Sequence, residues 1–174
     1  MKKRLFLLFG FFASPLVFSQ ILTVNSGSSV SIASGSSVTL GGLEIAPSDT
    51  YVINGDNAVS RSTSAITAGD NSSVSRVYST TALLSGFTGT LTFSYLDGEL
   101  NGIAEGDLVL ELQADDDSWT SYNGTVNETN NSVSYSFNEA VSFKAVTASA
   151  AGATLTIEDL SSATSSVFVY PNPT

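Results

Sequence analysis

The sequence predicts an all-β fold in which short Ser/Gly-rich β repeats precede an antiparallel β-sandwich, either Ig-like or jelly-roll-like. Three observations support this prediction. Apolar residues alternate with polar residues in short runs, which places them on one face of a strand. Clusters of Gly, Asn, Asp and Ser separate these runs and predict turns. No window of the chain shows a helical period.

The chain opens with the three parts of a secretory signal. A basic cluster occupies residues 2–4, and an almost wholly apolar run follows at 5–18. Val17 and Ser19 are small enough for recognition by a signal peptidase, so we expect a cleaved signal peptide at residues 1–19. The apolar run is shorter than the roughly 20 residues that span a bilayer, so we expect no membrane insertion after cleavage.

Export would leave an acidic protein. After removal of the signal peptide, three basic residues remain against 16 acidic residues, a net charge of −13. Such a surface repels nucleic acid and anionic membranes, so we expect neither as a partner. The chain has no Cys and no His. This composition excludes disulfides, a Cys nucleophile, a Ser-His-Asp triad and His-ligated zinc or iron.

Residues 20–45 contain an internal repeat. The pentapeptide SGSSV occurs at Ser26–Val30 and again at Ser34–Val38. One apolar position recurs with the same spacing of eight residues, at Val24, Ile32 and Leu40. Each unit is a short β pattern followed by a turn in which Gly supplies a positive φ. A meander of very short hairpins and a stack of solenoid-like rungs both fit, whereas the fixed apolar positions argue against a flexible linker.

The predicted sandwich occupies residues 46–160, and a short polar linker follows at 161–166. The strongest alternation lies in five runs, at Leu91–Tyr95, Leu108–Leu112, Val133–Phe137, Val141–Ala145 and Leu155–Ile157. Together with the weaker Ser/Thr/Val-rich runs before them, these predict about seven to nine strands.

The last eight residues, Val167–Thr174, place an apolar run before a Pro-Asn-Pro turn. Tyr170, Pro171, Asn172 and Pro173 resemble the Y-P-N-P motif that opens the type A C-terminal sorting domain of Bacteroidetes proteins secreted by the type IX pathway. The signal peptide, the polar linker and the Ser/Gly/Thr-rich β modules upstream also resemble flavobacterial exported proteins. In these, a segment like Glu99–Gly102 follows a central strand.

This resemblance implies Sec export to the periplasm and then delivery to the medium or the outer-membrane surface. It also implies the type IX secretion machinery as a partner, acting through the complete C-terminal domain. That domain is a small Ig-like β-sandwich, of which residues 167–174 would be only the first strand. We therefore expect that this chain alone does not complete secretion.

Asp97, Glu99 and Asn101 place oxygen ligands at alternate positions before a glycine, as at the start of a calcium loop. A complete loop would need a ligand where Leu108 stands. The alternative interpretation is a polar loop between strands, in which Asn and Gly serve the turn, and the spacing favours it. Asp115–Asp117 is a weaker calcium candidate, because three adjacent carboxylates are typical of a solvated loop.

Trp119 and Tyr122, with Tyr95 nearby on the core strands, are candidates for a glycan site. Aromatic rings stack on sugars because a pyranose has an apolar face. The alternative interpretation places the lone Trp in the core of the sandwich.

We therefore expect a non-catalytic secreted or cell-surface β module, a structural stalk or adhesion domain exported by the type IX pathway. The alternative is a carbohydrate-binding accessory domain of a secreted polysaccharide-acting protein. A small glycoside hydrolase is a third reading, but any acidic chain offers pairs of carboxylates.

Overall fold

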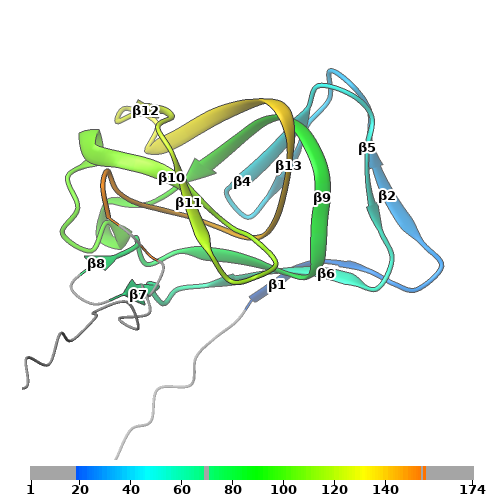
Figure 1. Ribbon diagram of the computed structural model, residues 1–174, viewed down its shortest axis with the longest axis horizontal. Helices are drawn as coiled ribbons and strands as arrows, with labels where there is room; N and C mark the ends of the chain where they lie inside the picture. The colour runs from blue at the N-terminus through cyan, green and yellow to red at the C-terminus, as the bar shows by residue number, and fades with distance from the viewer. Residues whose placement is uncertain (1–18, 69–70, 154, 156–174) are drawn as a thin grey trace, which may run out of the picture.

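The computed structural model describes residues 19–68, 71–153 and 155, and these residues form an all-β, antiparallel fold (Figure 1). The predicted all-β fold class is therefore confirmed. The predicted signal peptide, apart from Ser19, lies outside the described residues. So do the predicted linker at 161–166 and the tail that contains Tyr170–Pro173.

Strands account for most of the described chain, and two one-turn 3-10 helices interrupt them. The strands are β1 (Ser19–Val24), β2 (Ser29–Ile32), β3 (Val38–Leu40), β4 (Leu43–Pro47), β5 (Tyr51–Asn54), β6 (Asn57–Ser62), β7 (Thr67–Ala68), β8 (Asn71–Ser72), β9 (Val77–Ser94), β10 (Leu108–Gln113), β11 (Trp119–Tyr122), β12 (Thr125–Asn127) and β13 (Ser132–Ala150). The helices are η1 (Asp97–Glu99) and η2 (Glu105–Asp107). With 18 and 19 residues, β9 and β13 are far longer than the other strands.

The first six strands form one long, bent antiparallel ribbon. β3 pairs with β4 across the turn at Gly41–Gly42, β2 pairs with β5, and β1 pairs with β6. This nested pairing corrects both arrangements expected for the repeat, because β1–β3 pair with later strands and not with one another. The domain boundary expected after residue 45 falls inside β4. Residues from both sides of it share one hydrophobic core.

The repeated pentapeptide forms the two corners of this ribbon. At the first corner Ser28 N donates to Asn25 O at 3.0 Å, and the equivalent bond recurs eight residues later. Gly27 and Gly35 occupy the third turn position with φ of +75° and +76°, as a type II turn requires. Each straight leg then buries one apolar side chain, in the order Val24, Ile32 and Leu40.

β9 and β13 both bend midway (Figure 1). Gly86 and Gly89 give β9 φ values of +69° and +129°, and the register with β13 shifts between Phe137 and Val141. Such bulges bend a strand and increase its twist. Gly89 is also required because β4 passes so closely that a Cβ there would lie 2.3 Å from Ala46 O.

These bends fold a single nine-stranded sheet over on itself into two layers. The first half of β9 pairs with β6 and the second half with β4. In the same way, β13 pairs with β12 through its first half and with β10 through its second. β1 and β11 extend one layer, and β3 extends the other.

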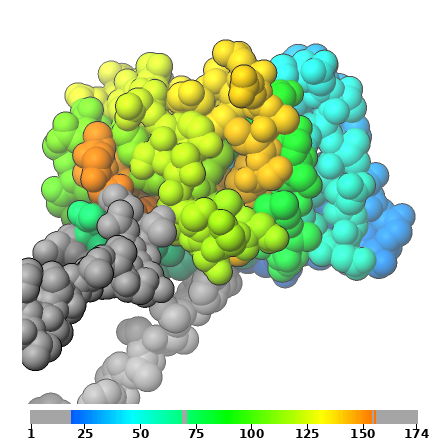
Figure 2. Space-filling model, viewed as in Figure 1, coloured from blue at the N-terminus to red at the C-terminus, as the bar shows by residue number. Residues whose placement is uncertain are grey.

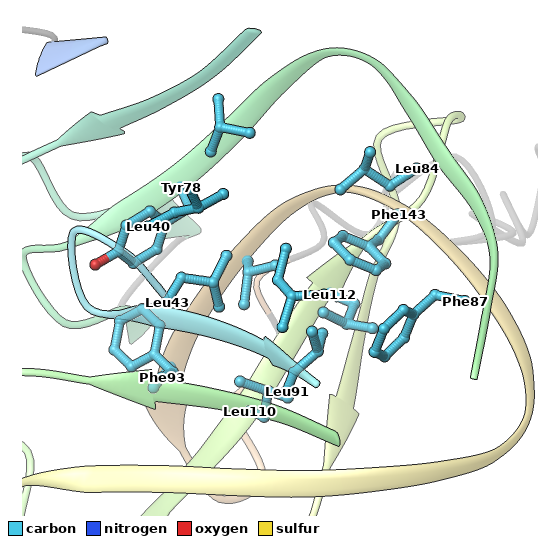
Figure 3. Packing of buried hydrophobic residues seen from close by; sticks show 14 of the residues in the cluster. Leu40, Leu43, Tyr78, Leu84, Phe87, Leu91, Phe93, Leu110, Leu112 and Phe143 are labelled. Carbon is cyan, nitrogen blue, oxygen red and sulfur yellow. The ribbon is translucent and has the colours of Figure 1, made fainter. Parts of the chain in front are cut away.

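The hydrophobic core lies between the two layers. Leu91 from one layer lies beside Leu110 from the other, and the ring of Phe93 meets that of Tyr78 edge to face at 5.8 Å (Figure 3). Where the strands bend, aromatic rings close the end of the core. The rings of Phe87 and Phe143 meet edge to face at 6.1 Å, and Tyr51 from β5 meets Phe87 at 5.3 Å in the same geometry, an arrangement that aromatic pairs prefer.

Candidate functional site

A buried ion pair joins the start of β9 to η1. Arg76 Nη2 donates to Glu99 Oε1 at 2.9 Å. Nε also lies 2.9 Å from Oε2, a charge contact without the geometry of a hydrogen bond. The remaining nitrogen, Nη1, donates to Ser94 O at the end of β9, at 2.7 Å. The side chains are only 8% and 17% exposed, so salt and water screen the pair weakly.

The same polar cluster holds the turn between β3 and β4. Tyr78 Oη donates to Gly41 O at 2.6 Å, and Arg61 Nη1 donates to the same carbonyl at 3.3 Å. Ser94 N donates to Gly42 O at 2.8 Å. Burial raises the pKa of the Tyr78 phenol, although the neighbouring guanidinium groups partly oppose this. The phenol therefore remains a hydrogen-bond donor at neutral pH.

The geometry of residues 97–101 opposes the predicted calcium loop. Glu99 gives its carboxylate to Arg76, and Asp97 Oδ1 accepts a hydrogen bond from the Asn131 amide. Asn101 has a left-handed φ of +55° that suits a turn. These contacts support the alternative interpretation, a polar loop between strands. Within the described residues, no three His, Cys, Asp or Glu side chains are arranged to hold a metal ion.

Carboxylates from three segments act electrostatically on the hydroxyl of Tyr95. Tyr95 Oη lies 3.4 Å from Glu105 Oε2, and Glu128 and Asp97 lie close enough to act on it electrostatically. Burial and then these negative charges raise the pKa of Tyr95 to about 12. The sequence pattern did not associate Glu128 with this loop, because Glu128 follows β12 and reaches the loop only in the folded chain.

The acidic run at Asp115–Asp117 forms the turn between β10 and β11. Asp117 Oδ1 lies 2.7 Å from Lys144 Nζ, which also donates to Asp115 O at 2.9 Å. Asp116 Oδ1 accepts from Ser118 Oγ at 2.6 Å, and the bonds from Ser118 lower the pKa of Asp116. These contacts hold the turn against β13, which agrees with a structural use of the run.

A second buried carboxylate lies in the middle of β10. Glu111 is 1% exposed, and its Oε1 accepts hydrogen bonds from Ser121 Oγ and Ser149 Oγ, both at 2.6 Å. Oε2 is buried without a hydrogen-bond partner. Burial therefore raises the pKa of Glu111, and the two serine hydroxyls oppose that shift. The sequence pattern does not reveal this group, because Glu111 alternates with leucines at a position that predicts a solvent-facing side chain.

Trp119 and Tyr122, predicted to form one sugar-stacking platform, lie on opposite faces of the sheet. Trp119 pairs with Gln113, and Tyr122 pairs with Leu110. Because neighbouring positions of a strand alternate between faces, Tyr122 shares the inner face with Leu110 while Trp119 lies outside. Tyr95 is buried in the core. Residues three apart in a strand point in opposite directions, so the structure does not bring Trp119 and Tyr122 together on one face.

Each of the two residues borders its own hollow. A groove of about 370 Å³ beside Trp119 is lined by Ile66, Thr67, Gln113, Asp116, Asp117, Ser118 and Leu155. A cleft of about 410 Å³ beside Tyr122 is lined by Tyr135, Ser136, Phe137, Asn138, Glu139, Ala140 and Val141. The second hollow, which we call the aromatic cleft, contains residues that the sequence pattern assigned only to strand packing.

No family model, curated protein or solved structure matches the chain. The fold and the sites described above define an all-β protein whose buried charged groups connect strands. Among the described residues, no helix has the length and apolar character needed to cross a membrane.

Proposed function

We propose that this chain is a non-catalytic β module of an exported protein, serving as a structural stalk or adhesion domain. The observation that supports the proposal is that the buried charged side chains connect strands and loops. Arg76 and Glu99 connect η1 with both ends of β9, and Glu111 connects β10 with hydroxyls on the strands beside it. These contacts join neighbouring strands and loops to one another, as expected of a structural scaffold.

The predicted signal peptide and the Tyr170–Pro173 motif support export by the type IX pathway. β1 begins at Ser19, with Ser19 opposite Arg61 and Gln20 opposite Ser60. Cleavage before Gln20 would therefore remove one paired residue and leave the rest of β1 in the sheet. The mature chain would keep the complete ribbon.

The export route is testable with the complete gene in a Bacteroidetes host. We expect the protein on the cell surface or in the medium when the type IX translocon is intact, and in the periplasm when the translocon is disrupted. Mass spectrometry of the N-terminus should show a chain that starts at Gln20. Equal distribution in the two strains would overturn the type IX route without affecting the assignment of a β module.

The absence of catalysis is a separate claim with its own test. The purified mature protein should turn over none of a panel of glycosidase and esterase substrates. Turnover that copurifies with the protein and is abolished by substitution of one of its carboxylates would overturn the claim.

A further inference from the structure

The aromatic cleft lies where β11 meets the bend of β13. Figure 2 shows this face, with the yellow-green surface around β11 beside the golden surface of β13. The ring of Tyr122 lies 5.1 Å from that of Tyr135 and 4.9 Å from that of Phe137. Both tyrosines are partly exposed, while Phe137 is buried beneath them. The cleft therefore has an aromatic floor that is open to solvent.

Polar groups form the rim of this floor. Asn138 and Glu139 are exposed and follow Phe137 directly, at the bulge where the register of β13 shifts. An amide offers both donors and an acceptor, a carboxylate offers acceptors, and each tyrosine adds a hydroxyl. The volume of about 410 Å³ lies within the range of small-molecule sites, which combine an apolar lining with a few polar groups.

We propose that the aromatic cleft binds a neutral pyranose unit of a polysaccharide. The apolar face of the sugar would lie against Tyr122 and Tyr135, and its hydroxyl groups would bond to Asn138 and Glu139. This binding activity goes beyond the scaffold role proposed above. It also differs from a glycan site centred on Trp119, which lies on the other face of β11.

Charge selects the class of sugar. Glu139 places a negative charge at the rim. All three basic side chains of the described residues are engaged elsewhere: Arg61 with Gly41 O, Arg76 with Glu99, and Lys144 with Asp117. An anionic polysaccharide would therefore meet a like charge and no counter-charge at the cleft, whereas a neutral one meets no such penalty.

The test is a binding screen of the mature protein against immobilised neutral oligosaccharides (gluco-, xylo- and manno-oligosaccharides), with oligogalacturonate as the anionic arm. A neutral hit is then measured by calorimetry. Asn138→Ala and Glu139→Ala alter exposed side chains, so both variants should fold. We expect each to weaken binding about tenfold, the equivalent of one good hydrogen bond. Tyr122→Phe, which keeps the ring, should weaken binding less than either.

Trp119→Phe is the matched control, because it changes an aromatic residue of the same strand on the opposite face. Binding that is lost in Trp119→Phe and retained in Asn138→Ala and Glu139→Ala would overturn the proposal. So would binding of oligogalacturonate alone, or of no sugar in the screen. A dimer whose contact maps to the cleft would assign this face to a second copy and would also overturn it. None of these outcomes bears on the export experiment, so the two proposals can fail separately.

Discussion

The guanidinium of Arg76 and the carboxylate of Glu99 face each other at 2.9 Å through two pairs of atoms. The residues lie 23 positions apart, before β9 and at the end of η1. Since Arg76 also binds Ser94 O, one side chain connects the loop after β9 to both ends of that strand. The pair therefore holds both ends of β9 in place relative to η1, in the layer that contains the Gly41–Gly42 turn.

Removal of one partner should leave the other charge buried and unpaired. We expect Glu99→Gln and Arg76→Met each to lower the free energy of unfolding by about 3 kcal/mol, measured by urea denaturation. Lys144→Met, which breaks the more exposed pair with Asp117, is the control and should cost less than about 1 kcal/mol. Equal effects at the two pairs would contradict this ranking.

Gly42 should tolerate substitution much less well than the repeat glycines. A Cβ at Gly42 would lie 2.6 Å from Arg76 Nη1 and 2.8 Å from Tyr78 Oη, with φ at +109°. Both of those atoms are held by hydrogen bonds, so they cannot move away without loss. We expect Gly42→Ala to cost about 3 kcal/mol.

Gly35→Ala is the matched comparison for Gly42→Ala. Gly35 also has a left-handed φ, +76°, but a Cβ there meets nothing within 4 Å. The backbone strain alone should cost about 1 kcal/mol. Thermal or urea unfolding of the two variants separates the steric cost from the conformational cost, and similar losses would show that the crowding at Gly42 is unimportant.

Glu111 should make stability depend on pH in the direction opposite to most carboxylates. Burial raises its pKa in the folded state above the ordinary value of 4.5, so the folded protein binds this proton more tightly than the unfolded chain. The stabilising contribution is present below pH 4.5 and is lost as pH rises through the folded-state pKa. We expect Glu111→Gln to be more stable than the wild type at pH 8.

The measurement for Glu111 is the difference between the unfolding free energies of wild type and variant from pH 4 to pH 8. That difference should grow with pH, because at high pH the wild type must bury an ionised carboxylate on folding and the variant does not. A difference that does not change with pH would contradict the assignment.

Calcium should not bind at Asp97, Glu99 and Asn101. Glu99 already holds a guanidinium, and a calcium ion would have to displace that charge-assisted contact. Excess chelator should therefore leave the midpoint of thermal unfolding unchanged. A midpoint that rises with added calcium, and no longer does so in Asp97→Asn, would restore the calcium loop.

The all-β class could be predicted from the sequence because its signal is local. Apolar and polar residues alternate in two runs, one with Leu91 and Phe93 and the other with Leu110 and Leu112. Each run lies in a strand, and its apolar side chains are in the core. Alternation reports which face of a strand is buried. It does not report which strand lies beside it.

Pairing partners could not be predicted for that reason. The repeat at residues 20–45 suggested contacts between its own units, yet Ile32 pairs with Tyr51 and Val24 pairs with Asn57. The partner arm, β4–β6, shows no copy of the repeat. Only the tight turn at Gly41–Gly42 marks the point where the chain reverses, and its position does not reveal the bends of the ribbon.

The sites were predicted less completely than the fold, because they are assembled from distant segments. Tyr122 was a candidate, but Tyr135 joins it from β13 and Trp119 points the other way. Glu99 was a candidate calcium ligand, but in the structure its carboxylate binds Arg76. In each case the motif identified a residue with a suitable side chain, but the residue that contacts it in the folded chain is not the one that the motif predicted.

The nested ribbon has a consequence for how this chain can change in length. Each eight-residue unit supplies one leg and one corner of the β1–β3 arm, and the β4–β6 arm matches it leg for leg. Duplication of a unit would lengthen one arm only and leave its new backbone groups without partners. A solenoid grows by copying its repeat, whereas this chain can grow only by simultaneous insertions on both sides of Gly41–Gly42.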